Sequence, residues 1–217
     1  MELYIVRHGQ SVAQTGTEMS DPPLTETGLL QARLTGQALQ NVSFDLVYAS
    51  HLTRAIRTAA AILAYQQSPP ALNVLPELAE CGSRDFVCDL EAIRALYPDM
   101  HIAADRCRPF DSDADRAAFC LEQCVYRNAY EGPLNIVSPT GDGELRLNDK
   151  NVLIVCHGVF NAHLIGQLVH FPFDRNVIVS QHNACINRFS LFTVNGVRRL
   201  RFKSFNSVAH LPEDLLT

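Results

Sequence analysis

The chain has 217 residues, of which 47% are hydrophobic and 19% are charged, so it can bury a sizeable core. This composition excludes a disordered or fibrous protein, and the length favours a single α/β domain over two independent domains. The formal net charge of −5 includes no block of like charges. We therefore expect no nucleic-acid partner, because such binding needs a basic surface, and an anionic ligand must be held by a local cluster of Arg and His.

The longest uninterrupted apolar run covers residues 59–65, whereas a membrane-spanning helix needs about 18 apolar residues. We therefore expect no membrane partner. The seven cysteines are odd in number and include no C-x-x-C pair, so neither a disulfide framework nor a structural zinc site is indicated. We interpret them as reduced thiols, which predicts a cytoplasmic protein without a metal site.

The first part of the chain alternates strand and helix patterns. Residues 3–6 form a short apolar run that predicts a buried strand, and Thr25 is suited to cap a helix that runs to about residue 38. Residues 44–49 predict a second strand. The helix after it carries apolar residues at i, i+3, i+4 and i+7, namely Ile56, Ala59, Ala60 and Leu63.

The middle of the chain is less regular than the segments on either side. It predicts a short helix over about 89–97, which Pro98 would end, and a longer helix over about 112–130. Gly-rich residues 140–143 indicate a hairpin turn.

The last part of the chain begins with a clear strand signal. Residues 152–156 are all apolar, which is typical of a parallel strand that is buried on both faces, and a helix over about 160–169 follows. Asn195-Gly196 then joins two alternating runs, 188–194 and 197–205, as an antiparallel hairpin.

Strand–helix units at 3–40, 44–66 and 152–169 predict the fold class. We expect an α/β three-layer sandwich, in which helices flank a mostly parallel central sheet. Residues 1–217 would form a single domain, and residues of about 80–150 would form a lid inserted between its halves.

Polar residues that suit an anion follow three of the predicted strands. They are Arg7-His8-Gly9 after the first strand, Ser50 with Arg54 after the second, and His157-Gly158 after the third. Ligands of parallel α/β sheets bind beyond the carboxyl ends of the strands, so these groups are expected to converge. Two Arg, two His and the adjoining helix N-termini predict a site for a phosphoryl dianion, which the two glycines would allow to approach the backbone closely.

These residues resemble a known family. Residues 3–11 are similar to the signature of the histidine phosphatase superfamily, also called the phosphoglycerate-mutase-like family. Further similarities follow in the family's order, at Asp21-Pro22-Pro23-Leu24-Thr25, Gly28, Gln31-Ala32, residues 50–59, residues 152–158, Asn206 and His210-Leu211. Together they cover most of the chain except residues of about 100–150.

The resemblance implies a phosphatase that needs neither a metal nor another cofactor. His8, as a neutral imidazole, would attack phosphorus and form a phosphohistidine. Arg7, Arg54 and His157 would hold the phosphoryl oxygens. The partner would be a small phosphorylated metabolite.

The family also uses a carboxylic acid that protonates the leaving oxygen and later activates water. Glu80, in Leu78-Ala79-Glu80, fits this pattern best, and Glu77 is the alternative. The expected substrate contacts include Gln14, which stands where the family often has Asn, together with Gly158 and Ser11. We expect Ser11 to order the nucleophile loop rather than to react.

Two other functions stay open on the same residues: a cofactor-dependent phosphoglycerate mutase and a non-catalytic phosphate-binding or scaffold protein. Mutases of this family usually carry Trp near the nucleophile, and the absence of Trp here favours the phosphatase. Four arginines in or near the expected lid either hold a second anionic group or form a surface neutralised by interleaved Asp, namely Arg84, Arg106, Arg108 and Arg116. The substrate is not specified, and a homodimer stays open.

Overall fold

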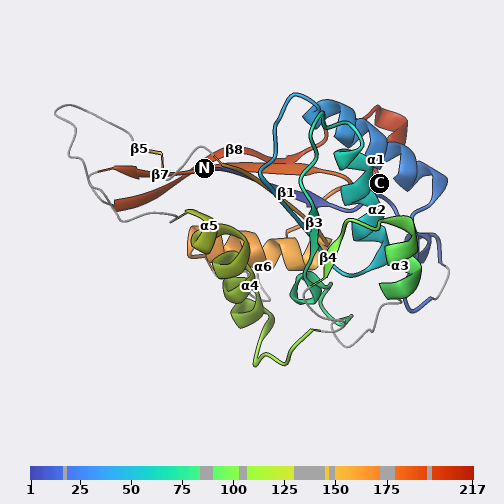
Figure 1. Cartoon of the computed structure of the whole chain (residues 1–217), viewed down its shortest axis with the longest axis horizontal. Helices are drawn as coiled ribbons and strands as arrows, with labels where there is room; N and C mark the ends of the chain where they lie inside the picture. Colours follow the sequence, from blue (N-terminus) through green and yellow to red (C-terminus); the bar gives the residue numbers. More distant parts are fainter. Residues whose placement is uncertain are drawn as a thin grey trace.

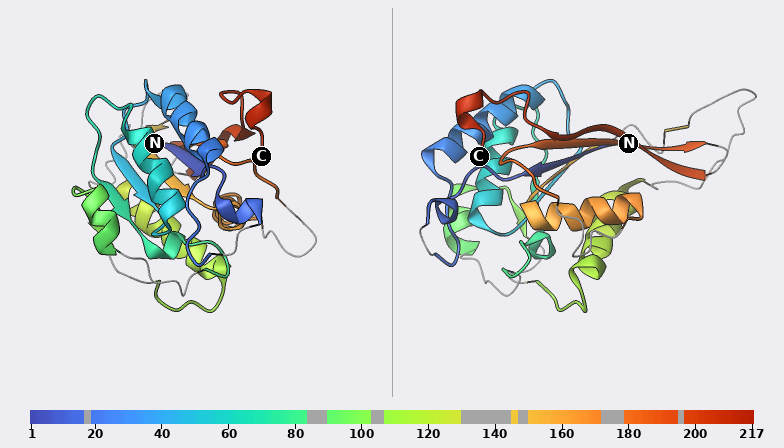
Figure 2. Two further views of the ribbon diagram at one scale, coloured as in Figure 1. Left: turned by 90° about the vertical axis from the view of Figure 1, so that its right-hand side faces the viewer. Right: turned by 180° about the vertical axis from the view of Figure 1, so that it is seen from behind.

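A central β-sheet carries the helices of the protein on both of its faces (Figures 1 and 2). The fold is that of a computed structural model, which describes residues 1–16, 19–83, 90–102, 107–129, 145–146, 150–171, 179–194 and 197–217. Within these residues the strands are β1 (Glu2–Arg7), β2 (Leu46–Ala49), β3 (Leu72–Val74), β4 (His101–Ile102), β5 (Leu145–Arg146), β6 (Asn151–Cys156), β7 (Ile186–Val194) and β8 (Val197–Ser207).

The sheet is mostly parallel, as the sequence predicts. Its strand order is β4-β3-β2-β6-β1-β7-β5, and β8 pairs with β7. The neighbours from β4 through β1 are all parallel, whereas β7 is antiparallel to β1, β5 and β8. The β7–β8 hairpin extends beyond the helices at one end of the molecule (Figure 1). Its predicted Asn195-Gly196 turn and the predicted turn at 140–143 lie outside the described residues.

The helices are α1 (Glu26–Leu39), α2 (Thr53–Leu63), α3 (Leu90–Leu96), α4 (Asp113–Leu121), α5 (Arg127–Ala129) and α6 (Gly158–Val169), with short 3₁₀ turns at Val12–Thr15, Pro76–Leu78 and Glu213–Leu215. Thr25 caps α1 as predicted, because its side chain accepts a 3.0 Å hydrogen bond from the Gly28 amide. None of the helices in the described part of the chain is long and apolar enough to cross a membrane.

Two apolar clusters on opposite faces of the sheet make the three-layer arrangement. Alternate residues of β1 and β6 point to opposite faces, so Ile5 and Ile154 join one cluster while Val6 and Val155 join the other. Residues of α4 and α6 complete the first cluster, and residues of α1 and α2 complete the second. The predicted three-layer α/β class is therefore confirmed.

One predicted helix is interrupted. In place of a continuous helix over 112–130, α4 ends at Leu121, a π-helical turn spans Glu122–Tyr126, and α5 follows. Although α4 belongs to the segment expected to form a lid, it supplies Ala117, Cys120 and Leu121 to the core. Its apolar stripe is wide enough to pack against α6, and for this reason it is part of a layer of the fold.

The strand register positions the site. β6 lies between β1 and β2, with Arg7 opposite Cys156 and Ala49 opposite Val155. The residues that follow the three strands, His8, Ser50 and His157, are therefore brought to the same edge of the sheet. Six cysteines are described, and none of these six is in a disulfide.

Candidate active site

The two histidines that follow β1 and β6 lie against each other at this edge. The ring centroids of His8 and His157 are 5.0 Å apart, with an angle of 60° between the ring planes. His8 is 4% exposed and His157 is fully buried. The convergence predicted from the strand ends is therefore present for these two residues.

The imidazole of His8 is oriented by a hydrogen bond at each nitrogen. Nδ1 lies 2.6 Å from the Gly9 carbonyl oxygen, which only accepts, so Nδ1 carries the hydrogen. Nε2 then presents its lone pair, which accepts a 3.2 Å hydrogen bond from Nε of Arg54. Burial, and then the nearby charges of Arg54 and Arg7, lower the pKa of His8 well below 6.5. His8 is therefore neutral, with a nucleophilic lone pair on Nε2.

Arg54 is fixed by an aspartate from a distant loop. The N-cap residue of α2, Leu52, has no side-chain acceptor, and the carboxylate of Asp21 accepts hydrogen bonds of 3.0 and 3.1 Å from the Thr53 amide instead. The same carboxylate lies 3.7 Å from Nη1 of Arg54, and both side chains are largely buried. Asp21 was predicted only as part of a family motif and was given no role. The apolar residue at the α2 N-cap nevertheless indicates that a residue outside the helix must supply the capping group.

Arg7 brings a second guanidinium group to the site. Nη1 donates to the carbonyl oxygen of Gln181, and buried Nε has no hydrogen-bond partner among the described residues. Burial lowers the pKa of Arg7, although a guanidinium stays protonated in proteins. A side chain at Gly158 would place its Cβ 3.1 Å from Nε of Arg7. The absence of a side chain at Gly158 therefore leaves room for the guanidinium group of Arg7.

The glycine after His8 has a packing role within the chain. A Cβ at Gly9 would lie 2.3 Å from the Gly28 carbonyl oxygen, and a Cβ at Gly28 would lie 2.0 Å from the Gln10 carbonyl oxygen. These distances require the loop after β1 to pack directly on the first turn of α1. The glycine lets two segments of this chain approach each other, and its close approach to a phosphoryl group stays a prediction.

His157 has hydrogen-bonding capacity that the described residues do not use. Neither ring nitrogen has a partner among them, although the side chain is fully buried. Leaving such a group unpaired costs about 1–3 kcal/mol, which a ligand oxygen would recover. Burial, followed by the charge of Arg54, lowers the pKa of His157 well below 6.5, so the ring is neutral.

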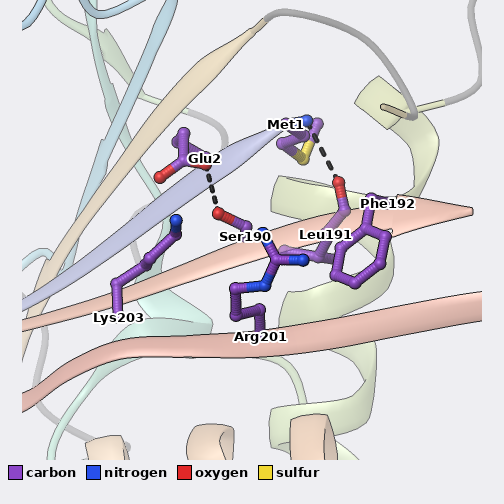
Figure 3. Close-up of a pocket in the computed structure, with 7 residues that line it drawn as sticks. All are labelled: Met1, Glu2, Ser190, Leu191, Phe192, Arg201 and Lys203. Carbon is purple, nitrogen blue, oxygen red and sulfur yellow. Dashed lines mark hydrogen bonds between the residues drawn. The ribbon is translucent and has the colours of Figure 1, made fainter. Parts of the chain in front are cut away.

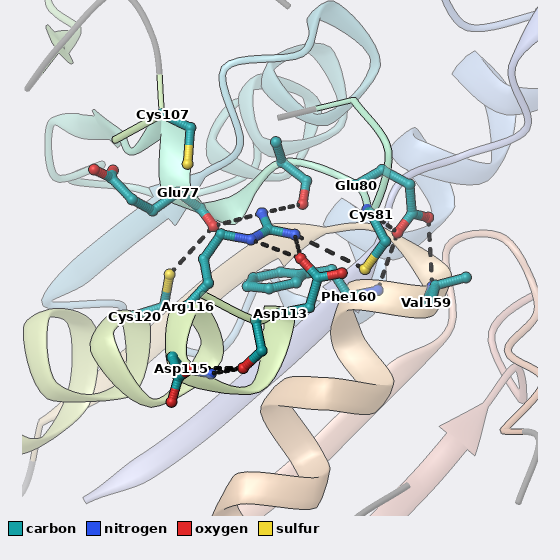
Figure 4. A network of polar contacts seen from close by, with 12 residues as sticks. Glu77, Glu80, Cys81, Cys107, Asp113, Asp115, Arg116, Cys120, Val159 and Phe160 are labelled. Carbon is teal, nitrogen blue, oxygen red and sulfur yellow. Dashed lines mark hydrogen bonds and ion pairs between the residues drawn. The ribbon is translucent and has the colours of Figure 1, made fainter. Parts of the chain in front are cut away.

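Glu80 lies at the N-terminus of α6. Its carboxylate accepts hydrogen bonds from the amides of Phe160 (3.0 Å), Val159 (3.4 Å) and Cys81 (3.0 Å), as Figure 4 shows. Its negative charge raises the pKa of Arg7 and Arg54, opposing the larger effect of burial. Glu80 therefore belongs to the electrostatic environment of the two arginines.

Glu77, the alternative carboxylate, points elsewhere. Its side chain extends away from Glu80 and Val159 (Figure 4). It does not line the pocket that contains His8 and Glu80, and its backbone carbonyl instead accepts hydrogen bonds from Arg116 and Cys120. The geometry favours Glu80.

A pocket of about 280 Å³ joins these groups. Its walls come from Arg7, His8, Ser11, Ala13, Gln14, Met19, Ser20, Pro22, Arg54, Glu80 and Ser83. Six of the predicted site residues therefore face one cavity. His157 and Gly158 are not among these lining residues; the His157 ring packs against His8, and Gly158 lies next to Nε of Arg7.

A network of amides orders the loop after His8. The Gln14 side-chain oxygen accepts hydrogen bonds from the Ser11 amide and from Asn183 Nδ2, both at 3.1 Å, while Nε2 donates to Asn183 Oδ1 at 2.8 Å. Asn183 Nδ2 also donates to the His8 carbonyl oxygen at 3.1 Å. One hydrogen of the Gln14 amide remains for a ligand. The sequence analysis missed Asn183, which is far from Gln14 along the chain.

Cys81, Asp113 and His163 are, among the described residues, close enough to suggest a metal site, because one ligand atom from each lies within 4.8 Å of the others. However, Arg116 donates to Asp113 Oδ1 at 2.8 Å and thus already places a cation there. Burial raises the pKa of Cys81 to about 12, which keeps the thiol protonated. The donor set does not fit a resident metal.

A second hollow lies at the opposite end of β1 (Figure 3). It measures about 120 Å³ and includes Glu2, Ser190, Arg201 and Lys203. Ser190 donates to the Glu2 carboxylate, and Lys203 contributes to the lowered pKa of Glu2. The residues that line this hollow include no histidine, so it offers no nucleophile that would compete with the His8 pocket.

Comparison with known proteins identifies the family. The profile of the histidine phosphatase superfamily (branch 1) matches residues 3–200. The chain belongs to the histidine phosphatase superfamily. The resemblance found in the sequence motifs is thereby confirmed.

Relatives in this superfamily include both phosphatases and mutases. The adenosylcobalamin/alpha-ribazole phosphatase of Escherichia coli (strain K12) is 40% identical over 89 residues, 40% of this chain and 43% of the relative. A 2,3-bisphosphoglycerate-dependent phosphoglycerate mutase of Azorhizobium caulinodans is 33% identical over 157 residues, 70% of this chain and 64% of the relative. The chain thus spans less than two thirds of these curated relatives.

A solved structure supports the fold. Mycobacterial hydrolase 2 has a TM-score of 0.67 and 22% sequence identity, and the match covers 99% of this chain and 94% of that chain. At this identity the similarity concerns the fold.

Proposed function

We propose that this protein is a phosphatase that hydrolyses a small phosphorylated metabolite through a phosphohistidine at His8, without a metal ion. The observation that carries the proposal is the neutral His8, with its Nε2 lone pair turned toward Arg54 in the pocket that Arg7 and Glu80 also line. With Glu80 protonated, as the acid of the first step has to be, the two guanidinium groups at this pocket have more positive charge than the 3.7 Å contact with Asp21 offsets. A phosphoryl dianion supplies the missing charge.

In the first step, phosphate binding draws Arg54 from His8 to the phosphoryl oxygens. Arg7 and His157 donate to the other oxygens. The freed Nε2 lone pair forms the N–P bond while the bond from phosphorus to the leaving oxygen breaks, and Glu80 gives its proton to that oxygen. Phosphoryl transfer needs little covalent chemistry from the protein, so positioning of the substrate and neutralisation of the charge on the phosphoryl oxygens supply most of the rate acceleration.

In the second step, Glu80 acts as a base. Its carboxylate takes a proton from water as the water oxygen bonds to phosphorus and the N–P bond breaks. Inorganic phosphate leaves, His8 is again neutral, and Glu80 is again protonated. The three amides around Glu80 stabilise the carboxylate form that this second step needs.

A phosphoglycerate mutase is the second candidate, because the curated mutase relative matches a larger share of the chain than the phosphatase relative does. A mutase uses the same nucleophile but returns the phosphoryl group to the product. It therefore isomerises phosphoglycerate with little release of inorganic phosphate. No feature of the described pocket requires that second transfer.

The test is phosphate release in excess EDTA from a panel of small phosphomonoesters. The panel includes p-nitrophenyl phosphate, 3-phosphoglycerate, fructose 2,6-bisphosphate, sugar phosphates and nucleoside monophosphates. We expect the wild type to release phosphate and His8→Ala to lose at least about 10³-fold in rate, as removal of a covalent nucleophile does. His101→Ala, which removes an exposed histidine of β4, is the matched control and should keep full activity.

Two results would contradict the proposal. Activity that persists in His8→Ala would exclude His8 as the nucleophile, and activity lost in EDTA but restored by a metal ion would exclude the metal-free mechanism. Isomerised phosphoglycerate without free phosphate would favour the mutase. Phosphate binding without turnover of any substrate would favour a non-catalytic phosphate-binding or scaffold protein.

A further inference from the structure

Arg116 is a fully buried cation outside the pocket. It is one of the four arginines for which the sequence left open either a second anionic group or a self-neutralised surface, but it is 0% exposed. It lies four residues before Cys120 on the buried stripe of α4, a periodicity that would have signalled its burial. A guanidinium is costly to bury unless its donors are satisfied, so its contacts indicate what it stabilises.

Most of these contacts are with the segment that carries Glu80 (Figure 4). Nη1 donates to the carbonyl oxygens of Glu77 (2.9 Å) and Ala79 (2.7 Å), and Nη2 lies 3.8 Å from Sγ of Cys81. The guanidinium therefore contacts the residues immediately before and after Glu80. Residues 79–81 form neither helix nor strand, so these side-chain contacts add to the two backbone hydrogen bonds that hold the segment, from Ala79 N to Pro76 O and from Ser83 N to Glu80 O.

Arg116 also supports the other partner of the Glu80 carboxylate. Its guanidinium lies 3.9 Å from the centroid of the Phe160 ring, and the Phe160 amide donates to Glu80 Oε1. Asp113 orients the guanidinium through bonds of 2.8 and 3.1 Å to one carboxylate oxygen. The Arg116 side chain therefore contacts both the backbone on either side of Glu80 and the Phe160 ring at the helix end that binds the Glu80 carboxylate.

We propose that Arg116 is a positioning residue, which holds the Glu80 carboxylate toward the pocket without touching the substrate. The catalytic consequence of this inference rests on the proposed function, in which Glu80 is the acid of the first step and the base of the second. A shift of about 1 Å in a catalytic group can cost about 100-fold in rate. Arg116 is suited to prevent such a shift.

The two steps of the reaction separate this role from general loosening of the fold. p-Nitrophenolate departs without a proton, so formation of phosphohistidine from p-nitrophenyl phosphate needs His8 and the arginines but little from Glu80. Hydrolysis of phosphohistidine needs Glu80 as the base. Loss of the positioning residue should therefore slow the second step and spare the first.

The experiment measures the burst and the steady state of p-nitrophenol release in Arg116→Lys and Arg116→Met, with Glu80→Gln as the reference. We expect both Arg116 variants to keep the burst rate within about 3-fold and to lose about 10- to 100-fold in the steady state, as Glu80→Gln does. The double variant Glu80→Gln/Arg116→Met should lose nothing further. Arg127→Met, which removes an exposed arginine of α5, is the matched control. EDTA is kept in all assays, because removal of Arg116 leaves Cys81, Asp113 and His163 free to capture a metal ion.

Hydrogen exchange of the Val159 and Phe160 amides gives a readout that needs no activity. These amides should exchange faster in the Arg116 variants and in Glu80→Gln than in the wild type, while the amides of β6 stay protected. Arg116→Lys keeps the positive charge, so it remains informative if Arg116→Met does not fold.

Three results would overturn the inference: steady-state activity equal to that of Arg127→Met, equal loss in burst and steady state, or unchanged exchange of the two amides. A wild type without His8-dependent turnover would refute the proposed function instead. In that case the exchange experiment alone decides whether Arg116 positions Glu80.

Discussion

At the scale of single residues, the site combines groups that follow parallel strands with buried residues that hold those groups in place. His8, Arg7 and Arg54 face one pocket because the ends of neighbouring strands share an edge, and this rule needs no knowledge of side-chain contacts. Glu80 lines the same pocket but was predicted only from the resemblance to the histidine phosphatase superfamily. The supporting residues could not be found in the same way. Asp21 and Arg116 bind backbone groups 32 and 39 residues away, and a pattern of neighbouring residues carries no such information.

The same limit applies to the two glycines and to Arg116. The sequence showed that small residues follow His8 and His157, but it did not show which atoms approach them. Likewise, the charge of Arg116 left open a second anion site or a surface position, whereas its guanidinium donates to carbonyl oxygens inside the protein. For buried polar residues, the identity of the partner decides the role.

At the scale of helices and strands, prediction succeeded where the apolar pattern was long. β6 was recognised because it pairs with parallel strands on both sides and is buried on both faces. β3 and β4 have three and two residues, which is too short for a pattern to emerge. The π-helical turn after α4 was missed because one inserted turn changes the helical period only locally.

The N-terminus of α2 gives a test at this scale. Asp21 replaces the missing cap of α2, so Asp21→Ala should lower the free energy of unfolding by about 0.5–2 kcal/mol. It should also raise KM, because Arg54 loses the carboxylate that orients it. Urea denaturation and steady-state kinetics measure the two effects.

Asp21→Asn separates the cap from the charge, since Asn and Asp are comparable helix caps. This variant should recover most of the stability while KM stays raised. Asp111→Ala, which removes an exposed aspartate, is the control. Equal stability of Asp21→Ala and Asp111→Ala would show that the capping interaction contributes nothing.

At the scale of the whole molecule, the buried histidines of the site lower the free energy of unfolding in acid. His8 and His157 are buried and neutral, with pKa values well below 6.5, whereas both take up protons in the unfolded chain below about pH 6.5. The unfolded state therefore binds more protons, and the free energy of unfolding must fall as the pH falls. The carboxyl groups whose pKa is lowered, Glu2 and Asp113, add their loss of stability at more acidic pH.

Urea denaturation between about pH 5 and pH 7 measures this dependence. Each buried neutral histidine should contribute a slope of up to about 1.4 kcal/mol per pH unit below its unfolded pKa. The free energy of unfolding of His157→Asn should therefore change less steeply with pH than that of the wild type, by up to about 1.4 kcal/mol per pH unit, which corresponds to one proton. His101→Asn should leave the slope unchanged. Equal slopes for the wild type and His157→Asn would mean that His157 takes up a proton in the folded protein.

The most direct measurement of the central claim is the detection of phosphohistidine. Glu80→Gln is mixed with p-nitrophenyl phosphate in EDTA, quenched in alkali within the burst, and digested for mass spectrometry. We predict one phosphoryl group on the peptide that contains His8, labile to acid, accumulated in Glu80→Gln but not in Glu77→Gln, and absent from His8→Asn. A phosphoryl group on any other residue, or a burst of p-nitrophenol with no phosphoryl group on the protein, would contradict the account.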